Sequence, residues 1–306
     1  MQIGIVGLGR MGGNMARRLR RAGVDVIGFD ADAAAVTALG KERVLEPAES
    51  IGALARRLSA PRVVWLMVPA GRPTELAVED LWPELVRGDL IVDGGNANYK
   101  DSQRRGLALA SAGLRFVDCG VSGGVWGLEN GYTLMFGGDA AAAAMIEPFV
   151  RILAPTPDAG WLHCGPCGAG HFVKMIHNGI EYAMMEAYAE GFALLKGNAK
   201  LGIDVASVAE TWRHGSVVRS WLLDLTADVL ERDAELADIA PIVADSGEGR
   251  WTAVEAIEQG VPAPVISLAL MMRFASQGRS EYADKLMAMM RKGFGGHAVA
   301  RKGAAQ

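Results

Sequence analysis

One short stretch of this sequence gathers most of the side chains that are able to do chemistry. They are Lys174, His177, Asn178, Glu181 and Tyr182. Their spacing, at about 100° per helical residue, places an amine, an imidazole, an amide, a carboxylate and a phenol along one side of a helix. Such a stripe can transfer protons and bind a polar ligand. The alternative is an ordinary solvated helix face, and only the rest of the chain can decide between the two.

A glycine-rich turn near the N-terminus indicates a cofactor with which these groups would work. The strand Gln2–Val6 leads into Gly7-Leu8-Gly9-Arg10-Met11-Gly12, followed by a helix to about Ala22 and a second strand to Phe29. The first glycine permits the tight turn, the second lets the backbone approach a pyrophosphate, and the third lets the helix pack on the strand. Because a strand and a helix flank these glycines, we predict a dinucleotide-binding domain.

Asp30 ends the second strand, where a carboxylate can bind the adenosine ribose and repel a 2′-phosphate. We therefore expect NAD as the cofactor, with NADP less favoured. The alternative is that Asp30 and Asp32 are turn residues or a cap for the helix that begins at Ala33. We interpret the basic run Arg17–Arg21 as the outer face and C-terminal end of the first helix, not as an anion site.

Further predicted strands alternate with helices, which indicates a parallel sheet covered on both faces. Ligands of such sheets bind beyond the carboxyl ends of the strands. The residues expected there are Met67, Val68, Pro69 and Asn96, toward the nicotinamide, and Ser122, Gly123 and Gly124, whose hydroxyl and N–H groups suit a carboxylate. Turn geometry alone is the alternative explanation for the Ser-Gly-Gly segment.

The composition changes near Gly160, after which strand signals largely disappear and helical patterns follow. Asp204 and Ser220 are expected to cap two of these helices. The predicted fold class is α/β: a Rossmann-type doubly wound sheet over residues 1–163, followed by an all-helical domain over residues 164–306. The basic, Gly/Ala-rich tail is predicted from its composition to be disordered.

Bulk properties exclude several classes of protein. A chain of 306 residues, 50% of them hydrophobic, can bury a large core. Its net charge of -4 gives no general attraction to nucleic acid or to a membrane surface. The longest apolar run, Val265–Met272, is far shorter than the roughly 20 residues of a membrane helix. Without a leader sequence or a disulfide framework, the protein is expected to be cytoplasmic.

Cys164-Gly165-Pro166-Cys167 has the letters of a redox dithiol. We expect no redox role, because the segment is predicted to be a linker after a complete dinucleotide fold. A zinc site formed with His163 and His171 is a further alternative, but coincidental linker residues are favoured. No metal site is predicted.

Several motifs together resemble decarboxylating 6-phosphogluconate dehydrogenases of the shorter form, along nearly the whole chain. They are Gly7–Asn14, Asp93–Asn96, Val121–Gly124 and Gly168–Tyr182. Arg250-Trp251-Thr252 is similar to the family's Lys-Trp-Thr, with arginine in place of lysine. Arg273 resembles the family's phosphate-holding arginine. The segment Arg291–His297 resembles the tail with which one subunit completes the site of its neighbour.

The resemblance implies oxidative decarboxylation of 6-phosphogluconate, a phosphorylated sugar acid, to ribulose 5-phosphate and CO2, without a metal. Lys174, its pKa lowered by burial and neighbouring cations, would take the 3-hydroxyl proton as hydride passes to the nicotinamide, and Glu181 would protonate the enediol. The residues implied to hold the substrate are Asn96, Ser122, Gly123, Gly124, His177, Asn178, Tyr182, Arg250, Thr252, Arg273, Arg291 and His297. A homodimer or homotetramer is implied as well.

Two other functions stay open at this point. One is another β-hydroxyacid dehydrogenase, such as one acting on 3-hydroxyisobutyrate. Such enzymes share the fold, the Ser-Gly-Gly turn and the lysine but lack the His-Asn-x-x-Glu-Tyr continuation. The other is a non-catalytic NAD-binding sensor, because enzyme folds are sometimes reused for binding. A sensor has no reason to keep the lysine, the glutamate and the phosphate cations together.

Overall fold

The computed structural model describes residues 1–300 and divides into two compact units, Met1–His177 and the part that begins at Asn178. One long helix, α8 (Ala169–Gly197), starts in the first unit and ends in the second. Among the described residues, none of the helices combines the length and the apolar character needed to span a membrane.

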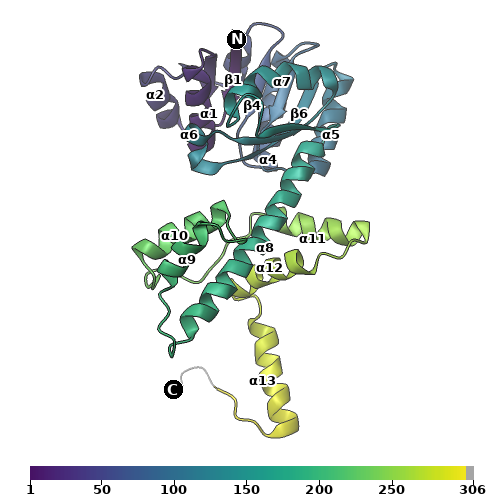
Figure 1. Ribbon diagram of the computed structural model, residues 1–306. Coiled ribbons are helices and arrows are strands. Elements are labelled where there is room, and N and C mark those ends of the chain that lie inside the picture. The colour runs from purple at the N-terminus through teal and green to yellow at the C-terminus, as the bar shows by residue number, and fades with distance from the viewer. Residues whose placement is uncertain (301–306) are drawn as a thin grey trace. The chain divides into compact units, whose positions relative to one another are not determined.

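The first unit is built on an eight-stranded sheet with the order β3-β2-β1-β4-β5-β6-β7-β8 (Figure 1). Neighbouring strands run parallel from β3 through β6, β7 is antiparallel to β6, and β8 is parallel to β7. The strands are β1 (Gln2–Val6), β2 (Asp25–Phe29), β3 (Glu46–Pro47), β4 (Val63–Leu66), β5 (Leu90–Asp93), β6 (Arg115–Ser122), β7 (Thr133–Gly137) and β8 (Trp161–Gly165). The predicted doubly wound α/β sheet is confirmed.

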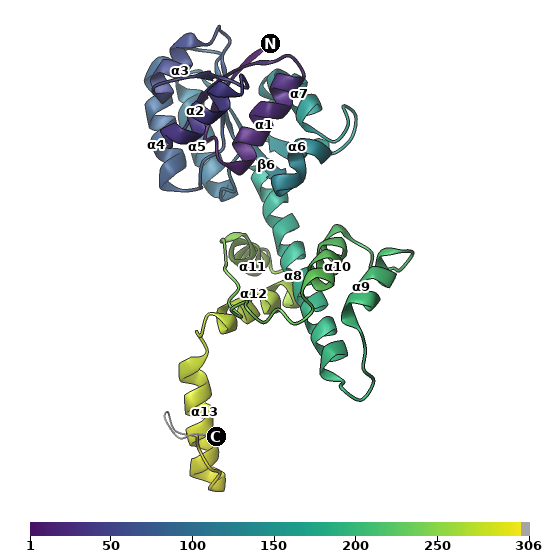
Figure 2. The ribbon, with the colours of Figure 1, turned by 90° about the vertical axis from the view of Figure 1, so that its left-hand side faces the viewer.

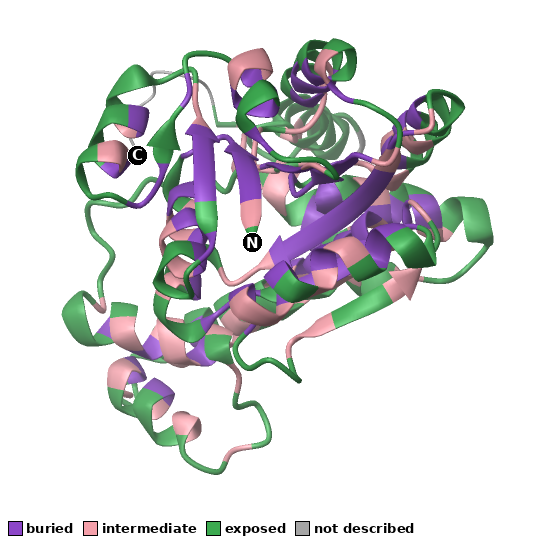
Figure 3. Cartoon of the chain, turned by 90° about the horizontal axis from the view of Figure 1, so that it is seen from above, coloured by how far each residue is buried: buried purple, intermediate pink, exposed green. Residues whose placement is uncertain are grey.

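Helices cover both faces of this sheet because alternate strand residues point to opposite sides. Ile3 and Ile5 of β1 belong to the core shared with α1, α2 and α7, whereas Val6 belongs to the core shared with α3, α4 and α5. Figure 3 shows the central strands as buried. The helices are α1 (Arg10–Arg21), α2 (Ala33–Lys41), α3 (Ile51–Arg57), α4 (Arg72–Leu81), α5 (Tyr99–Ser111), α6 (Gly127–Asn130) and α7 (Ala140–Leu153), with 3-10 turns at η1 (Trp82–Glu84) and η2 (Gly124–Trp126).

Strand β8 was missed by the sequence analysis, which placed the last strand signal before Gly160. It is a short strand at the edge of the sheet. Leu162 and His163 are both exposed, so the strand lacks the alternation of buried apolar and exposed polar residues by which strands are recognised in a sequence. The ring of His163 stacks on Phe136 of β7, with 5.4 Å between the centroids. Pairing with β7 therefore defines this strand more than its own composition does.

The second unit is helical, as predicted. Asp204 and Ser220 cap α9 and α10 as expected, accepting hydrogen bonds from the N–H groups of Ala206 and Leu223. A small core packs Phe192 of α8 against α9 and α10. The remaining helices are α9 (Val205–Arg213), α10 (Trp221–Arg232), α11 (Glu248–Gln259), α12 (Pro264–Ser276) and α13 (Glu281–Gly295).

Part of the C-terminal segment that was predicted to be disordered is helical. Residues up to Gly295 form the end of α13, so the prediction is wrong there, while residues 301–306 lie outside the described part of the chain. In Figures 1 and 2, α13 leads away from α11 and α12. Tyr282, Leu286 and Met290 of α13 are exposed.

Candidate active site

The glycine-rich turn follows β1, whose neighbours β2 and β4 lie on either side of it. At such a reversal of strand order, ligands bind beyond the carboxyl ends of the strands. Gly7 has a φ of +94°, and a Cβ there would lie 2.4 Å from the carbonyl oxygen of Met67. A Cβ on Gly12 would lie 2.0 Å from the carbonyl oxygen of Gly7. Gly9, at the start of α1, has no atom within 4 Å of such a Cβ, so its backbone faces open space.

A cleft of ≈ 500 Å³ lies at this point of the sheet. Its lining includes Gly7, Gly9, Asp30, Met67, Val68 and Pro69, all of them predicted cofactor residues. Leu8 is buried in the core and Met11 packs against it, so their side chains do not line the cleft. Arg10 is exposed at the first position of α1.

Asp30 takes part in the turn as well as in the cleft. Its two carboxylate oxygens accept the N–H groups of Leu8 at 2.5 Å and of Asp32 at 2.8 Å. Asp32 is the residue that caps α2, through the N–H of Ala34. Because an ionised carboxylate offers about four acceptor positions, Asp30 retains capacity for ribose hydroxyls while it braces the turn.

The arginines of α1 are engaged within the fold. Arg17, Arg20 and Arg21 form ion pairs with carboxylates. Arg18 instead donates to the backbone carbonyls of Ile152 and Ala154, at 2.9 and 2.6 Å. These contacts agree with a structural role for the basic run, and Arg18 is more buried than an outer-face residue was expected to be.

Asn96 and the Ser-Gly-Gly segment, all predicted to bind substrate, lie at the ends of two neighbouring strands. Asn96 is exposed in the loop after β5, between the buried Asp93 and Asn98, which caps α5. The neighbouring strand β6 ends at Ser122 and is followed by Gly123 and Gly124, whose φ values of +130° and +53° favour glycine. The carboxyl ends of neighbouring parallel strands thus present these polar groups at one edge of the sheet.

Lys174 is placed by the first turns of α8. Asp118 of β6 accepts the N–H groups of Gly168 at 2.6 Å and His171 at 2.7 Å, and so caps the start of the helix. Burial raises the pKa of Asp118 despite these hydrogen bonds. A Cβ on Gly120 would lie 2.3 Å from the Cβ of Lys174, so the glycine allows the lysine to lie directly on the strand.

The polar stripe of α8 is largely buried. Lys174, Asn178 and Tyr182 are 6%, 7% and 5% exposed, whereas the apolar Ile180 is 50% exposed. The solvated-face alternative is therefore wrong for these three residues. His177 and Glu181 are partly exposed. The Nζ of Lys174 lies 3.4 Å from Nδ1 of His177.

In the second unit, α8 packs closely on α11. A Cβ on Gly249 would lie 2.5 Å from the ring of Tyr182, and one on Gly179 would lie 2.7 Å from Thr252. The guanidinium carbon of Arg273 on α12 lies 3.5 Å from the centroid of the Tyr182 ring. A phenol, a hydroxyl and a planar cation are thereby brought together, which are groups that bind a phosphate.

Arg250 lies two residues before Thr252 on α11, and its guanidinium is paired with a carboxylate. Asp245 accepts from its Nη2 at 2.6 Å and also from the N–H of Gly247 at 3.0 Å. Burial raises the pKa of Asp245, but hydrogen bonds from Arg250 and Gly247, together with the charges of Arg250 and Arg273, hold that pKa below its ordinary value. The substituted arginine therefore has a fixed carboxylate partner.

Other predicted substrate residues are not brought to this cluster in the single chain. Arg291 and His297 are exposed, on α13 and just after it. Sequence reasoning also missed the buried partners Ser102 and Asp118 and the partly buried Asp245. The sequence signal for Asp118 was an acidic residue directly after the apolar Phe116 and Val117. In the structure it lies opposite Asp93 of the neighbouring strand.

The Cys-Gly-Pro-Cys segment does not lie wholly in a linker, because Cys164 belongs to β8. The prediction that this segment is a linker is therefore wrong for Cys164 and Gly165. Burial raises the pKa of Cys164 and raises the pKa of Cys167 to about 12. Redox dithiols have lowered thiol pKa values, so the raised values here give no support to a redox role. Within residues 1–300, no group of three or more His, Cys, Asp or Glu side chains is arranged to hold a metal ion.

The fold and the site define a class: a dinucleotide-binding dehydrogenase with a helical second unit. Residues 2–164 match the model for the NAD binding domain of 6-phosphogluconate dehydrogenase, and residues 170–304 match that for its C-terminal domain. The chain belongs to the 6-phosphogluconate dehydrogenase family.

Individual relatives agree with this assignment. The chain is 44% identical to the NAD(+)-dependent, decarboxylating 6-phosphogluconate dehydrogenase of Haloferax volcanii, over 99% of both chains. The structure of Plasmodium falciparum 6-phosphogluconate dehydrogenase superimposes with a TM-score of 0.83 at 26% identity, covering 100% of this chain and 67% of that one. A 3-hydroxyisobutyrate dehydrogenase from Salmonella typhimurium gives a TM-score of 0.76 at 25% identity, covering 91% and 95%.

Proposed function

We propose that this protein oxidatively decarboxylates 6-phosphogluconate to ribulose 5-phosphate and CO2 while reducing NAD. The observation that carries the proposal is the buried Lys174, which lies on Gly120 of β6 with its amine beside His177. Burying an ammonium group is costly unless it is paired and hydrogen-bonded, so neither a solvated helix nor a core helix favours a lysine here. Buried titratable groups of this kind are concentrated at functional sites.

In this mechanism Lys174 accepts the proton of the substrate 3-hydroxyl as the C3 hydrogen leaves as hydride to the nicotinamide. The resulting β-keto acid loses its C1 carboxylate as CO2. The protonated lysine then donates a hydrogen bond to the developing enolate oxygen. Glu181, two turns further along the same helix, protonates the carbon that carried the lost carboxylate, which is C2 of the substrate and becomes C1 of ribulose 5-phosphate. Asn96, Ser122, His177 and Asn178 orient the sugar acid.

The phosphate is assigned to the second unit. Tyr182, Thr252 and Arg273 lie together there, and Arg250 is anchored nearby by Asp245. The exposed Arg291 and His297 would act on the site of a neighbouring copy. This role requires a homodimer or homotetramer, in which the apolar side chains of α13 would also be covered.

NAD is the proposed cofactor, with NADP less favoured. Asp30 lines the cleft beside Gly9 and retains acceptor capacity for ribose hydroxyls. The Haloferax volcanii relative is named as NAD(+)-dependent, whereas the Plasmodium falciparum structure is described with NADP+. A cytoplasmic location stays a prediction.

The direct test is an assay of purified protein with 6-phosphogluconate and either NAD or NADP, following reduced nicotinamide and released CO2. No reduction with either cofactor would refute the proposal. Lys174→Met should abolish turnover and leave NAD binding intact. Lys41→Met, at an exposed position at the end of α2, is the matched control and should keep full activity.

The same assay separates the alternatives. A 3-hydroxyisobutyrate dehydrogenase would reduce NAD with that unphosphorylated substrate, without CO2 release. A sensor would bind NAD and turn over neither substrate. The buried Asn178 and Tyr182 and the nearby Arg273 favour the phosphorylated substrate.

A further inference from the structure

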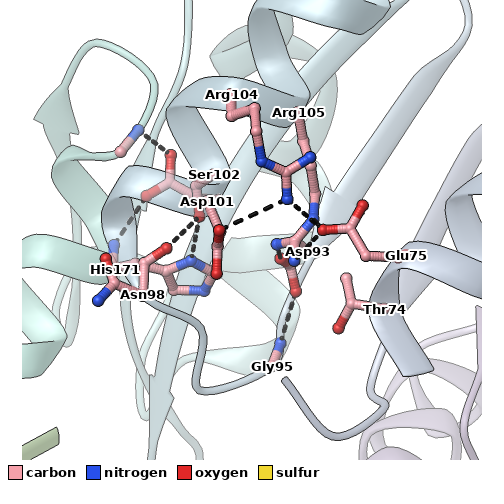
Figure 4. A network of polar contacts seen from close by, with 12 residues as sticks. Thr74, Glu75, Asp93, Gly95, Asn98, Asp101, Ser102, Arg104, Arg105 and His171 are labelled. Carbon is pink, nitrogen blue, oxygen red and sulfur yellow. Dashed lines mark hydrogen bonds and ion pairs between the residues drawn. The ribbon is translucent and has the colours of Figure 1, made fainter. Parts of the chain in front are cut away.

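A chain of buried polar contacts connects α5 to the start of α8 (Figure 4). Ser102 and Asp118 are 0% exposed and His171 is 1% exposed. The Oγ of Ser102 lies 2.7 Å from Nδ1 of His171, and the backbone N–H of His171 donates to Asp118. None of these three residues has a role in the proposed reaction.

The elements that this contact joins are those that carry the chemistry. Ser102 lies in the first turn of α5, where its N–H donates to the carbonyl of Asn98 at 3.2 Å. Asn98 ends the loop that carries Asn96. On the other side, His171 precedes Lys174 by three residues, or about one helical turn.

The other end of the same loop is fixed by a buried ion pair. Asp93 accepts the N–H of Gly95 at 3.2 Å and pairs with Arg105 at 3.0 Å, both side chains being at most 1% exposed. Arg105 also pairs with Glu75 of α4 at 2.9 Å. The beginning of the loop is fixed in this way, and the Ser102–His171 contact links its end to α8.

Stability does not account for an imidazole at this place. A buried side-chain hydrogen bond adds little net stability, and replacing both partners by apolar groups of the same shape is often nearly neutral. Whichever nitrogen carries the proton, Nε2 of His171 is buried with no hydrogen-bond partner among the described residues, which is itself unfavourable. A polar pair kept at this cost defines one geometry more strictly than apolar packing does.

We propose that Ser102 and His171 are positioning residues for the dehydrogenase reaction. Their hydrogen bond sets the position of the Asn96 loop relative to the helical turn that presents Lys174. The inference rests on the proposed function, because oxidation of the sugar acid requires the Asn96 loop and the Lys174 turn to hold fixed positions relative to each other. It makes neither residue catalytic, since both act through the elements that they connect.

The experiment compares Ser102→Ala, His171→Phe and the double variant with wild type, using 6-phosphogluconate and NAD. Each single variant should lose about tenfold in kcat, since small misplacements of catalytic groups are costly. The dissociation constant for NAD, measured by titration without substrate, should stay within about twofold, because no residue of the cleft changes. The double variant should lose no more than the worse single variant, because the two side chains form one contact.

Ser111→Ala is the matched control. Ser111 is an exposed residue of the same helix whose hydroxyl donates to the carbonyl of Ala108, and its loss should leave kcat unchanged. Rates are compared well below the unfolding temperature of each variant, so that lowered stability alone does not lower kcat. If His171→Phe fails to fold, Ser102→Ala decides the question.

Three results would contradict the inference. One is a Ser102→Ala variant with wild-type kcat, which would leave the contact a purely structural role. Another is a parallel loss of NAD affinity, kcat and thermal stability, which would indicate general damage. A third is additive loss in the double variant. An inactive wild-type protein would instead refute the proposed function itself, so the two failures are distinguishable.

Discussion

Gly120→Ala tests how closely α8 must approach the sheet. A Cβ at this position would lie 2.3 Å from the Cβ and 2.7 Å from the Cγ of Lys174. Carbon atoms in contact normally lie about 3.5–4.0 Å apart, so Lys174 must move by roughly 1.2 Å or more. The Cβ of Lys174 is fixed to the helix backbone, and rotation of the side chain cannot relieve the overlap. The first turns of α8 must therefore shift.

A misplacement of about 1 Å can cost about 100-fold in rate, so we expect kcat to fall by about that factor. The overpacking should also lower the free energy of unfolding by about 1–3 kcal/mol. NAD binding should persist, since the cleft at β1 is not altered. Steady-state kinetics, NAD titration and urea unfolding measure the three quantities.

Gly4→Ala is the matched control for overpacking. Gly4 is also a buried strand residue, and its Cβ would lie 2.4 Å from Cδ2 of Leu54, the flexible end of a side chain remote from the predicted catalytic residues. It should cost stability but keep kcat. A folded Gly120→Ala protein with kcat within about twofold of wild type would refute the idea that this glycine places the lysine.

Three further predictions concern the cofactor, the thiols and the phosphate cluster. Asp30→Ala should reduce the preference for NAD over NADP, and an unchanged ratio of kcat/KM values would limit the residue to bracing the turn. Because burial raises the pKa of Cys164 and raises the pKa of Cys167 to about 12, alkylation should be slow at neutral pH and accelerate as pH rises, while a Cys164→Ser/Cys167→Ser protein keeps its kcat; rapid labelling or lost activity would contradict this. Asp245→Asn should raise KM for 6-phosphogluconate several-fold by releasing Arg250. Since the pKa of Asp245 is lowered in the folded protein, its stabilising contribution is present above the ordinary Asp pKa of about 3.9 and is lost as pH falls through the lowered value. The unfolding free-energy difference from wild type should therefore be constant from about pH 8 to 5 and shrink only in stronger acid, and a difference that already shrinks at pH 6 would refute the assignment.

Local patterns in the sequence were sufficient for the parts of the fold that depend on local rules. The strands β1, β2, β4 and β5 are apolar runs bounded by turns, and the glycines at positions 7 and 12 occupy places where a Cβ would meet backbone. The helical spacing of Lys174 to Tyr182 likewise follows from residue order alone. The candidate residues could be named because their types and spacings carry that information.

Tertiary structure decided the rest, because burial and pairing depend on residues far away in the chain. It placed the polar side of α8 inside and Ile180 outside, the reverse of an ordinary amphipathic helix. It formed β8 through its pairing with β7, although the composition of that segment gives little strand signal. It also joined Ser102 to His171, 69 residues further along the chain. Periodicity in a sequence identifies which residues share a face, but only the packing of distant elements determines which face is buried and against which partners.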